Sequence, residues 1–217
     1  NMAFMSRRDH KQQVITFTSF NEGAGKTFIS YNLAMSLVHA KKSVVLVDLD
    51  IRKGTLSHYF GKRKRGVTNF LVDSSIKVDD IIEHENGVDV ITAGSSAPNP
   101  AELLMDSRLD ELIDELRKRY DYVVIDSVPV GIVADASITN RFVDLTVFVM
   151  RAGRLDRRQL PDVEKLYTEG KLRNMSVVLN GVNPKRHGYG YGYGYGYGYG
   201  YGYGYGYGYG NKKKKKS

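Results

Sequence analysis

The stretch "VITFTSFNEGAGKTF", residues 14–28, decides the fold, because an apolar run leads there directly into a glycine-containing loop. The run is rich in β-branched and aromatic residues, as strands are. In the loop, Gly23 and Gly25 let backbone N–H groups approach phosphate oxygens, Lys26 can reach the β- and γ-phosphates, and the hydroxyl of Thr27 can ligate Mg²⁺. A helix that begins here adds the positive end of its dipole. The stretch therefore predicts a strand, a phosphate-binding loop and a helix, in that order.

The alternation of strands and helices continues along the chain. Five more apolar runs predict strands, and these runs are continuous rather than alternating, as in parallel sheets covered on both faces. Residues with helical spacing fill the gaps. We therefore expect an α/β domain with a mainly parallel sheet, helices on both faces, and ligands beyond the carboxyl ends of the strands. The five runs lie at residues 43–48, 88–94, 122–126, 145–150 and 176–180.

Two helices are predicted in more detail from the spacing of their apolar residues. The first follows the glycine loop, and Lys41 and Lys42 suit its C-terminus. The second opens with "NPAE", where we expect Asn99 as the N-cap, Pro100 as the first helical residue and Glu102 as the partner in a capping box. The apolar stripes are Ile29, Leu33 and Leu37 in the first helix, and Leu104, Leu109, Leu112, Ile113 and Leu116 in the second.

Aspartates follow two of the predicted strands. Asp48 and Asp50 stand two residues apart in "VVLVDLDIRKG", and Asp126 follows four apolar residues in "YVVIDSVPVG". Carboxylates this close repel one another, and a cation would remove the conflict. An aspartate in the position of Asp126 also suits a Mg²⁺ ion, held directly or through water. Together with the glycine loop, the strand ends predict one site for phosphate and cation.

Composition narrows the possible functions. The net charge of the 217 residues is +8, but the run from Lys212 to Lys216 supplies five of these charges and leaves +3 (+8 less five) to the rest. A nucleic-acid-binding domain would carry a basic face on the fold itself, so we expect no nucleic-acid partner. The absence of cysteine excludes disulfides, thiol catalysis and iron–sulfur clusters. No apolar run reaches about 18 residues, no signal peptide is recognisable, and the start at Asn1 without Met suggests a piece of a longer chain.

A low-complexity segment forms the C-terminal part of the sequence. Eleven of the sixteen tyrosines alternate with glycine there, and the lysine run follows them. Ordering so much glycine costs backbone entropy, so we expect this segment to be disordered. The predicted organisation is one domain over residues 1–187 and a tail over residues 188–217.

Three motifs resemble those of the bacterial tyrosine kinases, the BY-kinase family. They are "NEGAGKT" (residues 21–27), "VVLVDLDIR" (44–52) and "VVIDSVP" (123–129). They match a Walker A loop, hydrophobic residues followed by Asp-x-Asp-x-Arg, and a Walker B motif ending in Asp-x-x-Pro. The similarity extends to about residue 183, and a tyrosine cluster follows, as in the family. The resemblance implies a P-loop NTPase-like fold and a protein-tyrosine kinase that uses ATP and Mg²⁺.

The resemblance also implies roles for single residues. Lys26 and Thr27 would bind the ATP phosphates and Mg²⁺, and Asp50 and Asp126 would hold the Mg²⁺ ion. Asp48 would orient the tyrosine hydroxyl, because a carboxylate is a poor base for a phenol and the loose transition state needs little deprotonation. Lys26, Asp48 and Asp50 are the implied catalytic residues. The implied ATP-binding residues are Asn21, Glu22, Gly23, Ala24, Gly25, Lys26, Thr27, Phe28 and, at the adenine, Asn180.

Family members phosphorylate their own C-terminal tyrosines and other proteins, and they act in capsule and exopolysaccharide export. The implied partners are the tail of a neighbouring subunit, a membrane activator or co-polymerase region, and a protein-tyrosine phosphatase. The implied location is the cytoplasmic face of the bacterial inner membrane. The implied phosphoacceptors are Tyr189, Tyr191, Tyr193, Tyr195, Tyr197, Tyr199, Tyr201, Tyr203, Tyr205, Tyr207 and Tyr209.

Departures from the usual motifs leave other interpretations open. Phe20 replaces the first glycine of the common phosphate-loop pattern. Thr55 stands where proteobacterial relatives have a regulatory tyrosine, and Tyr59 lies four residues on. A partition or division-site ATPase would need its lysine at the position of Asn21, and an iron–sulfur scaffold ATPase would need cysteines. A third alternative is a non-catalytic adaptor with a docking tail, against which the intact Lys26 and the three aspartates argue.

Overall fold

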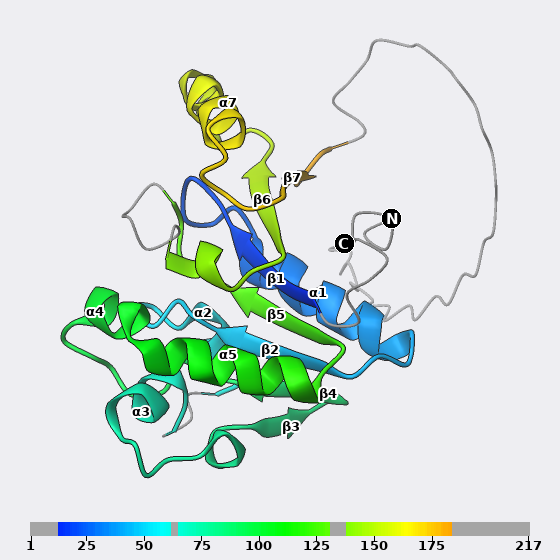
Figure 1. Ribbon diagram of the computed structural model, residues 1–217. Coiled ribbons are helices and arrows are strands. Elements are labelled where there is room, and N and C mark those ends of the chain that lie inside the picture. The colour runs from blue at the N-terminus through cyan, green and yellow to red at the C-terminus, as the bar shows by residue number, and fades with distance from the viewer. Residues whose placement is uncertain (1–12, 62–64, 131–137, 184–217) are drawn as a thin grey trace, which may run out of the picture. The chain divides into compact units, whose positions relative to one another are not determined.

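One sheet of seven strands runs through the part of the chain that the computed structural model describes, residues 13–61, 65–130 and 138–183 (Figure 1). The chain divides into two units, residues 1–182 and 183–217, and the sheet with its helices belongs to the first. The strand order is β3-β4-β2-β5-β1-β6-β7, and every pair is parallel except β3–β4. The strands are β1 (Gln13–Thr18), β2 (Val44–Asp48), β3 (Glu83–Glu85), β4 (Val88–Ile91), β5 (Tyr122–Asp126), β6 (Leu145–Arg151) and β7 (Met175–Asn180).

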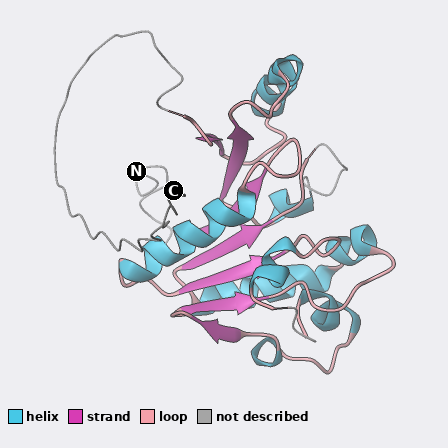
Figure 2. Cartoon of the chain, turned by 180° about the vertical axis from the view of Figure 1, so that it is seen from behind, coloured by secondary structure: helices cyan, strands magenta, loops and turns pink. Residues whose placement is uncertain are grey.

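Helices cover both faces of this sheet (Figures 1 and 2). The long helix after the glycine loop packs on one face, and the long helix before β5 packs on the other. The α-helices are α1 (Lys26–His39), α2 (Thr55–Tyr59), α3 (Val67–Val72), α4 (Pro100–Met105), α5 (Ser107–Arg119) and α7 (Leu160–Thr168). The 3₁₀ turns are η2 (Val78–Asp80), η3 (Thr139–Arg141) and η4 (Arg157–Gln159).

The central strands are apolar throughout because both of their faces are buried. In β2, Val45 and Val47 belong to the core cluster beneath α5, whereas Val44 and Leu46 belong to the cluster beneath α1. All four side chains are buried. The α/β prediction is therefore confirmed, with a mainly parallel sheet and helices on both faces, and all six predicted strands are present within a few residues of their predicted bounds.

The edge strand β3 is the one that the apolar pattern missed. It pairs antiparallel with β4 through a tight turn at Asn86 and Gly87, which have φ angles of 53° and 84°. Such angles are typical of the Asn-Gly hairpin turn. The strand's own sequence, Glu-His-Glu, carries no apolar side chain, so the hairpin is indicated by its turn and not by its strand.

The stripe of the first predicted helix is confirmed, but its end differs from the prediction. Helix α1 ends at His39, so Lys41 and Lys42 lie beyond it. Lys41 adopts a left-handed φ of 60°, and the backbone N–H groups of Lys41 and Lys42 donate to the carbonyls of Val38 and Leu37. These backbone bonds, rather than the lysine charges, satisfy the last carbonyls of the helix.

The predicted capping box of the second helix is wrong. Asn99 stands at the N-cap position of α4, as predicted, but its side chain makes no hydrogen bond to the backbone there, and its Nδ2 donates instead to Oε2 of Glu102 at 2.6 Å. Pro100 is the first helical residue, as predicted. The two side chains satisfy each other, so they leave the backbone N–H groups of the first turn to other partners.

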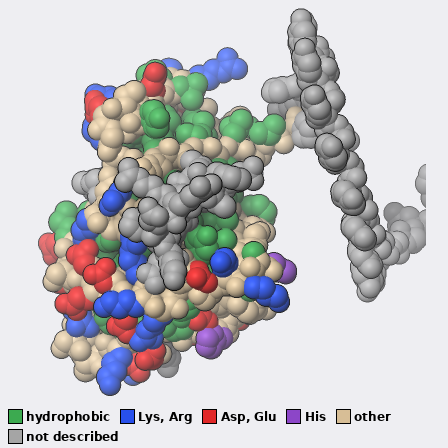
Figure 3. Space-filling model, turned by 45° about the vertical axis from the view of Figure 1, so that its right-hand side comes forward, with side chains coloured by type: hydrophobic (Ala, Val, Ile, Leu, Met, Phe, Trp, Pro, Cys, Tyr) green, Lys and Arg blue, Asp and Glu red, His purple; other side chains and the backbone are tan. Residues whose placement is uncertain are grey.

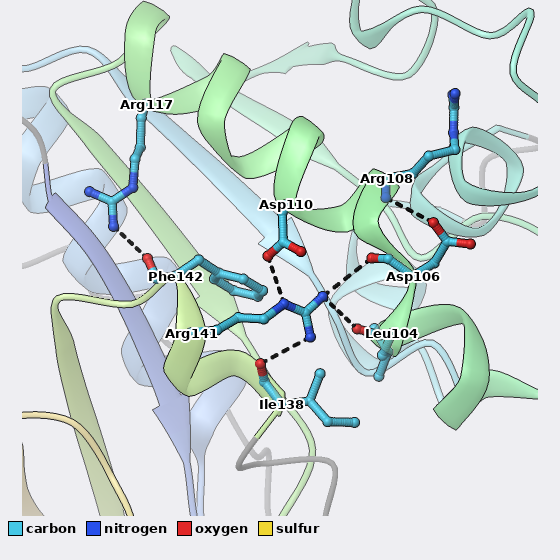
Figure 4. A network of polar contacts seen from close by, with 8 residues as sticks. All are labelled: Leu104, Asp106, Arg108, Asp110, Arg117, Ile138, Arg141 and Phe142. Carbon is cyan, nitrogen blue, oxygen red and sulfur yellow. Dashed lines mark hydrogen bonds and ion pairs between the residues drawn. The ribbon is translucent and has the colours of Figure 1, made fainter.

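The second helix is also divided in two, because Asp106 takes an extended conformation and caps α5 by accepting from the N–H of Arg108 at 2.8 Å. The guanidinium of Arg141 holds the break in place (Figure 4). Its Nη2 donates to the carbonyls of Leu104 at 3.0 Å and Asp106 at 3.3 Å, and its Nε donates to Asp110 at 2.6 Å. An arginine therefore supplies the donors that the end of α4 lacks. Among the described residues, none of the helices has the length and apolar character needed to cross a membrane.

Candidate active site

The glycine loop between β1 and α1 has a backbone that its glycines make possible. Gly23 and Gly25 have φ angles of 70° and 97°, in the left-handed region that a Cβ disfavours. A Cβ on Gly25 would also collide with the side-chain amide of Asn180. That amide donates to the carbonyl of Ala24 at 2.9 Å, so β7 holds the loop from one side. Because α1 begins at Lys26, the free N–H groups of its first turn are available to an anion.

The ammonium group of Lys26 is buried among carboxylates. Its residue is 9% exposed, and its Nζ donates to Oγ of Ser19 at 3.4 Å. Burial lowers the pKa of Lys26, while the charges of Asp126, Asp50 and Glu22 act to raise it. A partly desolvated cation at the start of a helix is suited to an anionic ligand such as phosphate.

Asp126, at the end of β5, has one oxygen that is paired and one that is not. Its Oδ2 accepts from Oγ1 of Thr27 at 2.5 Å. Its Oδ1 is buried and has no hydrogen-bond partner among the described residues. Burial raises the pKa of Asp126 to about 6, while Thr27 and Lys26 act to lower it. An unsatisfied buried carboxylate oxygen costs free energy, and a cation is the ligand that would satisfy it.

Asp48 ends β2 directly opposite Asp126 in the parallel register of β2 and β5. Its Oδ2 accepts from the N–H of Ser57 at 2.8 Å and from the Ser57 hydroxyl at 2.6 Å. Its Oδ1 accepts from the N–H of Asp50 at 3.0 Å. Burial raises the pKa of Asp48 to about 7, against the lowering effect of the Ser57 hydrogen bonds. The carboxyl group is thus fixed in one orientation, and Oδ1 keeps a lone pair for a further donor.

Asp50 lies in the turn after β2 and is 8% exposed. Its Oδ1 accepts from the N–H of Lys53 at 3.2 Å. No group of three or more His, Cys, Asp or Glu side chains in the described residues is arranged to hold a metal ion by itself. Mg²⁺ is ordinarily bound by one or two carboxylates together with water and substrate phosphates. The donor set at these strand ends, Thr27, Asp50 and Asp126, therefore fits a Mg²⁺ ion that arrives with a phosphate ligand.

Among the remaining predicted residues of the loop, the Ala24 side chain is buried in the core, whereas Asn21, Glu22 and Phe28 are exposed. Nδ2 of Asn21 donates to Gln159 at 3.1 Å, and Glu22 forms an ion pair with Lys53 at 2.6 Å. The ring of Phe28 is 67% exposed, so only its backbone belongs to the loop and the helix start. The predicted phosphoacceptors, Tyr189 to Tyr209, and the proposed boundary at residue 187 lie outside the described residues.

Three residues at the site were missed from the sequence. Ser57 joins Asp48 to the segment after β4, because its Oγ also accepts from the N–H of Ala93 at 2.7 Å. Arg151 donates from Nη1 to the carbonyl of Gly23 at 2.9 Å, and the guanidinium of Arg154 lies beside the same glycine. Arg151 is the last residue of β6, so the rule that ligands gather at carboxyl ends of strands could have found it. No local pattern marks Ser57.

Comparison with known proteins extends the match beyond the motifs. A family model described as an AAA domain matches residues 12–141. The tyrosine-protein kinase CpsD of Streptococcus pneumoniae is 33% identical over 174 residues, covering 78% of this chain and 76% of CpsD. The tyrosine-protein kinase EpsB of Ralstonia solanacearum is 35% identical over 187 residues, and this chain spans only 25% of its length.

Among solved structures, the kinase domain of the Escherichia coli tyrosine kinase ETK superposes with a TM-score of 0.77. Its sequence identity is 30%, and the match covers 89% of this chain and 76% of the ETK chain. Sequence and fold both agree with these proteins. The chain therefore belongs to the family of bacterial tyrosine-protein kinases.

Proposed function

We propose that this chain transfers the γ-phosphate of ATP to tyrosine hydroxyl groups of proteins. The observation that carries the proposal is the pair of buried carboxylates, Asp48 and Asp126, which are paired in the register of β2 and β5, with the ammonium of Lys26 close to Asp126. A P-loop hydrolase needs an acidic residue at one strand end to hold its metal ion. A second buried carboxylate supplies a partner for an acceptor hydroxyl, and the relatives named tyrosine-protein kinases support this use of it.

The binding residues act on the phosphates. The loop from Asn21 to Phe28 wraps them with backbone N–H groups, and the first turn of α1 adds its positive end. Lys26 neutralises charge on the transferred phosphate, which makes it a contact that strengthens as the transition state forms. Asn180 holds the loop through Ala24, and we assign it to the adenine side of the nucleotide.

Thr27, Asp50 and Asp126 would hold Mg²⁺. The unpaired Oδ1 of Asp126 is the structural feature that favours this assignment. When bound, the ion neutralises phosphate charge and fixes the orientation of the β- and γ-phosphates. Thr27 orients Asp126 through its hydroxyl, so the two residues form a pre-arranged pair of oxygen donors.

Asp48 positions the acceptor. Its Oδ2 is held by Ser57, and its Oδ1 accepts one hydrogen bond from Asp50 and can accept a second from the tyrosine hydroxyl. Little deprotonation is needed in a loose transition state, so the role of Asp48 is to aim the phenol oxygen at the γ-phosphate. The proton leaves with or after transfer, and the raised pKa of Asp48 makes that carboxylate a competent acceptor for it.

The acceptors we propose are the eleven tyrosines from Tyr189 to Tyr209, phosphorylated between subunits. We place this reaction at the cytoplasmic face of a bacterial membrane, together with a membrane co-polymerase partner. A protein-tyrosine phosphatase would remove the phosphates. In this proposal, phosphorylation of the tail regulates capsule or exopolysaccharide synthesis. Acidic and basic side chains are interspersed on the face seen in Figure 3, which favours protein partners over nucleic acid.

The test is mass spectrometry of the purified chain before and after incubation with ATP and Mg²⁺. We expect phosphotyrosine in the wild-type chain and none in Lys26→Met. Lys53→Met is the matched control, because Lys53 lies beside the loop but its side chain is 58% exposed. ATP hydrolysis without any phosphotyrosine would contradict the proposal and favour the ATPase alternative.

A further inference from the structure

A cluster of aromatic rings lies on the surface beside the candidate active site. The ring of Tyr31 is 5.3 Å from that of Tyr59 and 5.7 Å from that of Phe60, and the rings of Tyr59 and Phe60 are 5.3 Å apart. Interplanar angles of 50° to 78° are those of tilted and edge-to-face pairs. We call Tyr31, Tyr59 and Phe60 the aromatic patch.

The aromatic patch packs on the hydrophobic core on one side and is exposed to solvent on the other. Tyr31 and Phe60 are partly buried and pack against the core cluster beneath α1. Tyr59 is 67% exposed, as is Phe28 one helical turn before Tyr31. Rings fixed at the base and exposed at the top present π-faces and edges to a ligand at little conformational cost.

The two helices that carry the patch also hold the site. Helix α1 places Thr27 against Asp126, and Tyr31 lies four residues on along the same face of that helix, about 6 Å along its axis. Helix α2 places Ser57 against Asp48, and Tyr59 follows two residues later. The patch is therefore carried by the same two helices that position the carboxylates.

We propose that the aromatic patch binds unphosphorylated tyrosines of the Tyr–Gly repeat (residues 188–210) presented by a second copy of this chain. The proposal rests on the kinase function given above and adds a docking site to it. Phenol rings are suitable ligands for a cluster of phenol and phenyl rings. In the repeat every second residue is a tyrosine, and glycine between them leaves the rings unobstructed.

The repeat offers acceptor tyrosines at several distances from a docked one. In an extended chain, tyrosines two residues apart are separated by roughly 7 Å, and those four apart by roughly 13 Å. One tyrosine can thus occupy the patch while another, two to four residues away, reaches the carboxylates. Because the eleven tyrosines are equivalent, release from the patch is followed by rebinding of a neighbour, which raises the local concentration of acceptors.

Phosphorylation would weaken this docking. Each phosphate adds a charge of about −1.5 to −2 and strong hydration. The rings of the patch carry no positive charge of their own, so a phosphotyrosine that stacks on them loses water, and a compensating ion pair would have to come from the basic run at residues 62–65 that follows Phe60 in the sequence. Modified tyrosines therefore leave, and unmodified ones take their place.

The binding test needs no ATP. Fluorescence anisotropy measures the affinity of a labelled peptide of six Gly-Tyr units for the full chain and for Tyr59→Ala, Tyr59→Phe and Tyr167→Ala. Every variant carries its own Tyr–Gly repeat, which competes with the labelled peptide to the same extent in each. Tyr167 is the matched control, because it is 65% exposed and lies on α7, away from the site helices.

We expect Tyr59→Ala to weaken peptide binding at least fivefold, and Tyr59→Phe and Tyr167→Ala to bind like the wild type. A fully phosphorylated peptide, or one with serine for tyrosine, should bind at least fivefold more weakly than the unmodified peptide. Equal affinity of Tyr59→Ala and wild type would overturn the proposal. So would a change in self-association of Tyr59→Ala, measured by light scattering, without any change in peptide binding.

A kinetic test separates docking from catalysis. With ATP and Mg²⁺, Tyr59→Ala should raise KM for the repeat peptide several-fold and leave turnover of a peptide with a single tyrosine unchanged. An equal loss of activity toward both peptides would mean that Tyr59 only supports the fold of α2, and the docking proposal would fail. If the wild type binds the repeat but phosphorylates neither peptide, the kinase function fails while the docking site stands.

Discussion

The hydroxyl of Thr27 donates to Asp126 at 2.5 Å and so ties the first turn of α1 to the end of β5. Thr27→Val keeps the shape of the side chain and removes the donor. Asp126 then has both oxygens unpaired in a buried place, so we expect a loss of about 1–3 kcal/mol in the free energy of unfolding without nucleotide.

The same variant should need at least tenfold more Mg²⁺ for half-maximal activity, because it loses one proposed ligand. Thr27→Ser is the matched control and should behave like the wild type in both measurements. Denaturant unfolding and a magnesium titration of the rate decide the matter. Equal magnesium requirements in Thr27→Val and wild type would remove Thr27 from the metal site.

Asp48→Asn should impair phosphoryl transfer far more than ATP binding. The Asp48 carboxyl group is held by Ser57 and by the N–H of Asp50, and its proposed partner is the acceptor, so its loss should leave the phosphate loop intact. Calorimetry with ATP should give an affinity within about threefold of the wild type, while single-turnover transfer falls by at least 10²-fold. A collapse of ATP affinity with surviving transfer would make Asp48 a binding residue instead.

The same substitution should change how stability depends on pH. The pKa of Asp48 is raised from 3.8 to about 7 in the folded chain, so the unfolded chain releases this proton near pH 4 while the folded chain keeps it until about pH 7. Stability therefore falls as pH rises through this window, by up to roughly 4 kcal/mol from this group. Asparagine cannot ionise, so the Asp48→Asn variant lacks this pH-dependent loss of stability.

Denaturant unfolding with EDTA and without nucleotide checks this, because Asp48→Asn should gain stability relative to the wild type steadily from pH 4 to pH 7. Asp162→Asn, at an exposed position on α7, is the control for the loss of a surface carboxylate. Parallel stability curves for Asp48→Asn and wild type would show that the buried carboxyl group does not hold its proton.

Phosphate should concentrate on Tyr189 to Tyr209 and not on the core. Thr55 is the first residue of α2, and the ring of Tyr59 is held against Tyr31 and Phe60, so neither can extend into the site without unfolding α2. Peptide mapping by mass spectrometry after incubation with ATP and Mg²⁺ checks this. A main phosphate on Tyr59 or another core tyrosine would reverse it.

Arg141→Met should destabilise the fold by about 2 kcal/mol, because the carbonyls of Leu104 and Asp106 lose their donor (Figure 4). Arg158→Met is the matched control. Among the residues that the structure describes, Arg158 forms an ion pair with Asp156 alone, at the exposed surface, and such pairs contribute little. Thermal unfolding should show a lower Tm than the wild type for Arg141→Met but not for Arg158→Met. Equal Tm values for Arg141→Met and the wild type would show that water replaces the guanidinium at no cost in stability.

The elements that the sequence predicted well are those whose signal is local. Parallel strands buried on both faces are continuous apolar runs, and the phosphate loop is recognised by glycines whose φ angles require them. The acidic strand ends could be assigned to one site because parallel strands bring their carboxyl ends to one edge. The register of Asp48 against Asp126 agrees with that reasoning.

The features that were missed or wrong depend on contacts between distant segments. The break before α5 is fixed by Arg141, which lies 35 residues after Asp106 in the sequence. Ser57 orients Asp48 only because the segment after β4 lies beside it and supplies the N–H of Ala93. Asn99 was expected to cap a helix, but its side chain found Glu102, and no local pattern distinguishes these outcomes.

The edge position of β7 has a consequence for the phosphate loop. Among the described strands, β7 pairs with β6 alone, and its last residue, Asn180, holds the carbonyl of Ala24. Edge strands open locally at lower free energy than central ones, and each opening of β7 would release the loop. A nucleotide that binds the closed loop must therefore slow hydrogen exchange in β7, so the fraying of a strand at the margin of the sheet is thermodynamically linked to occupancy of the site.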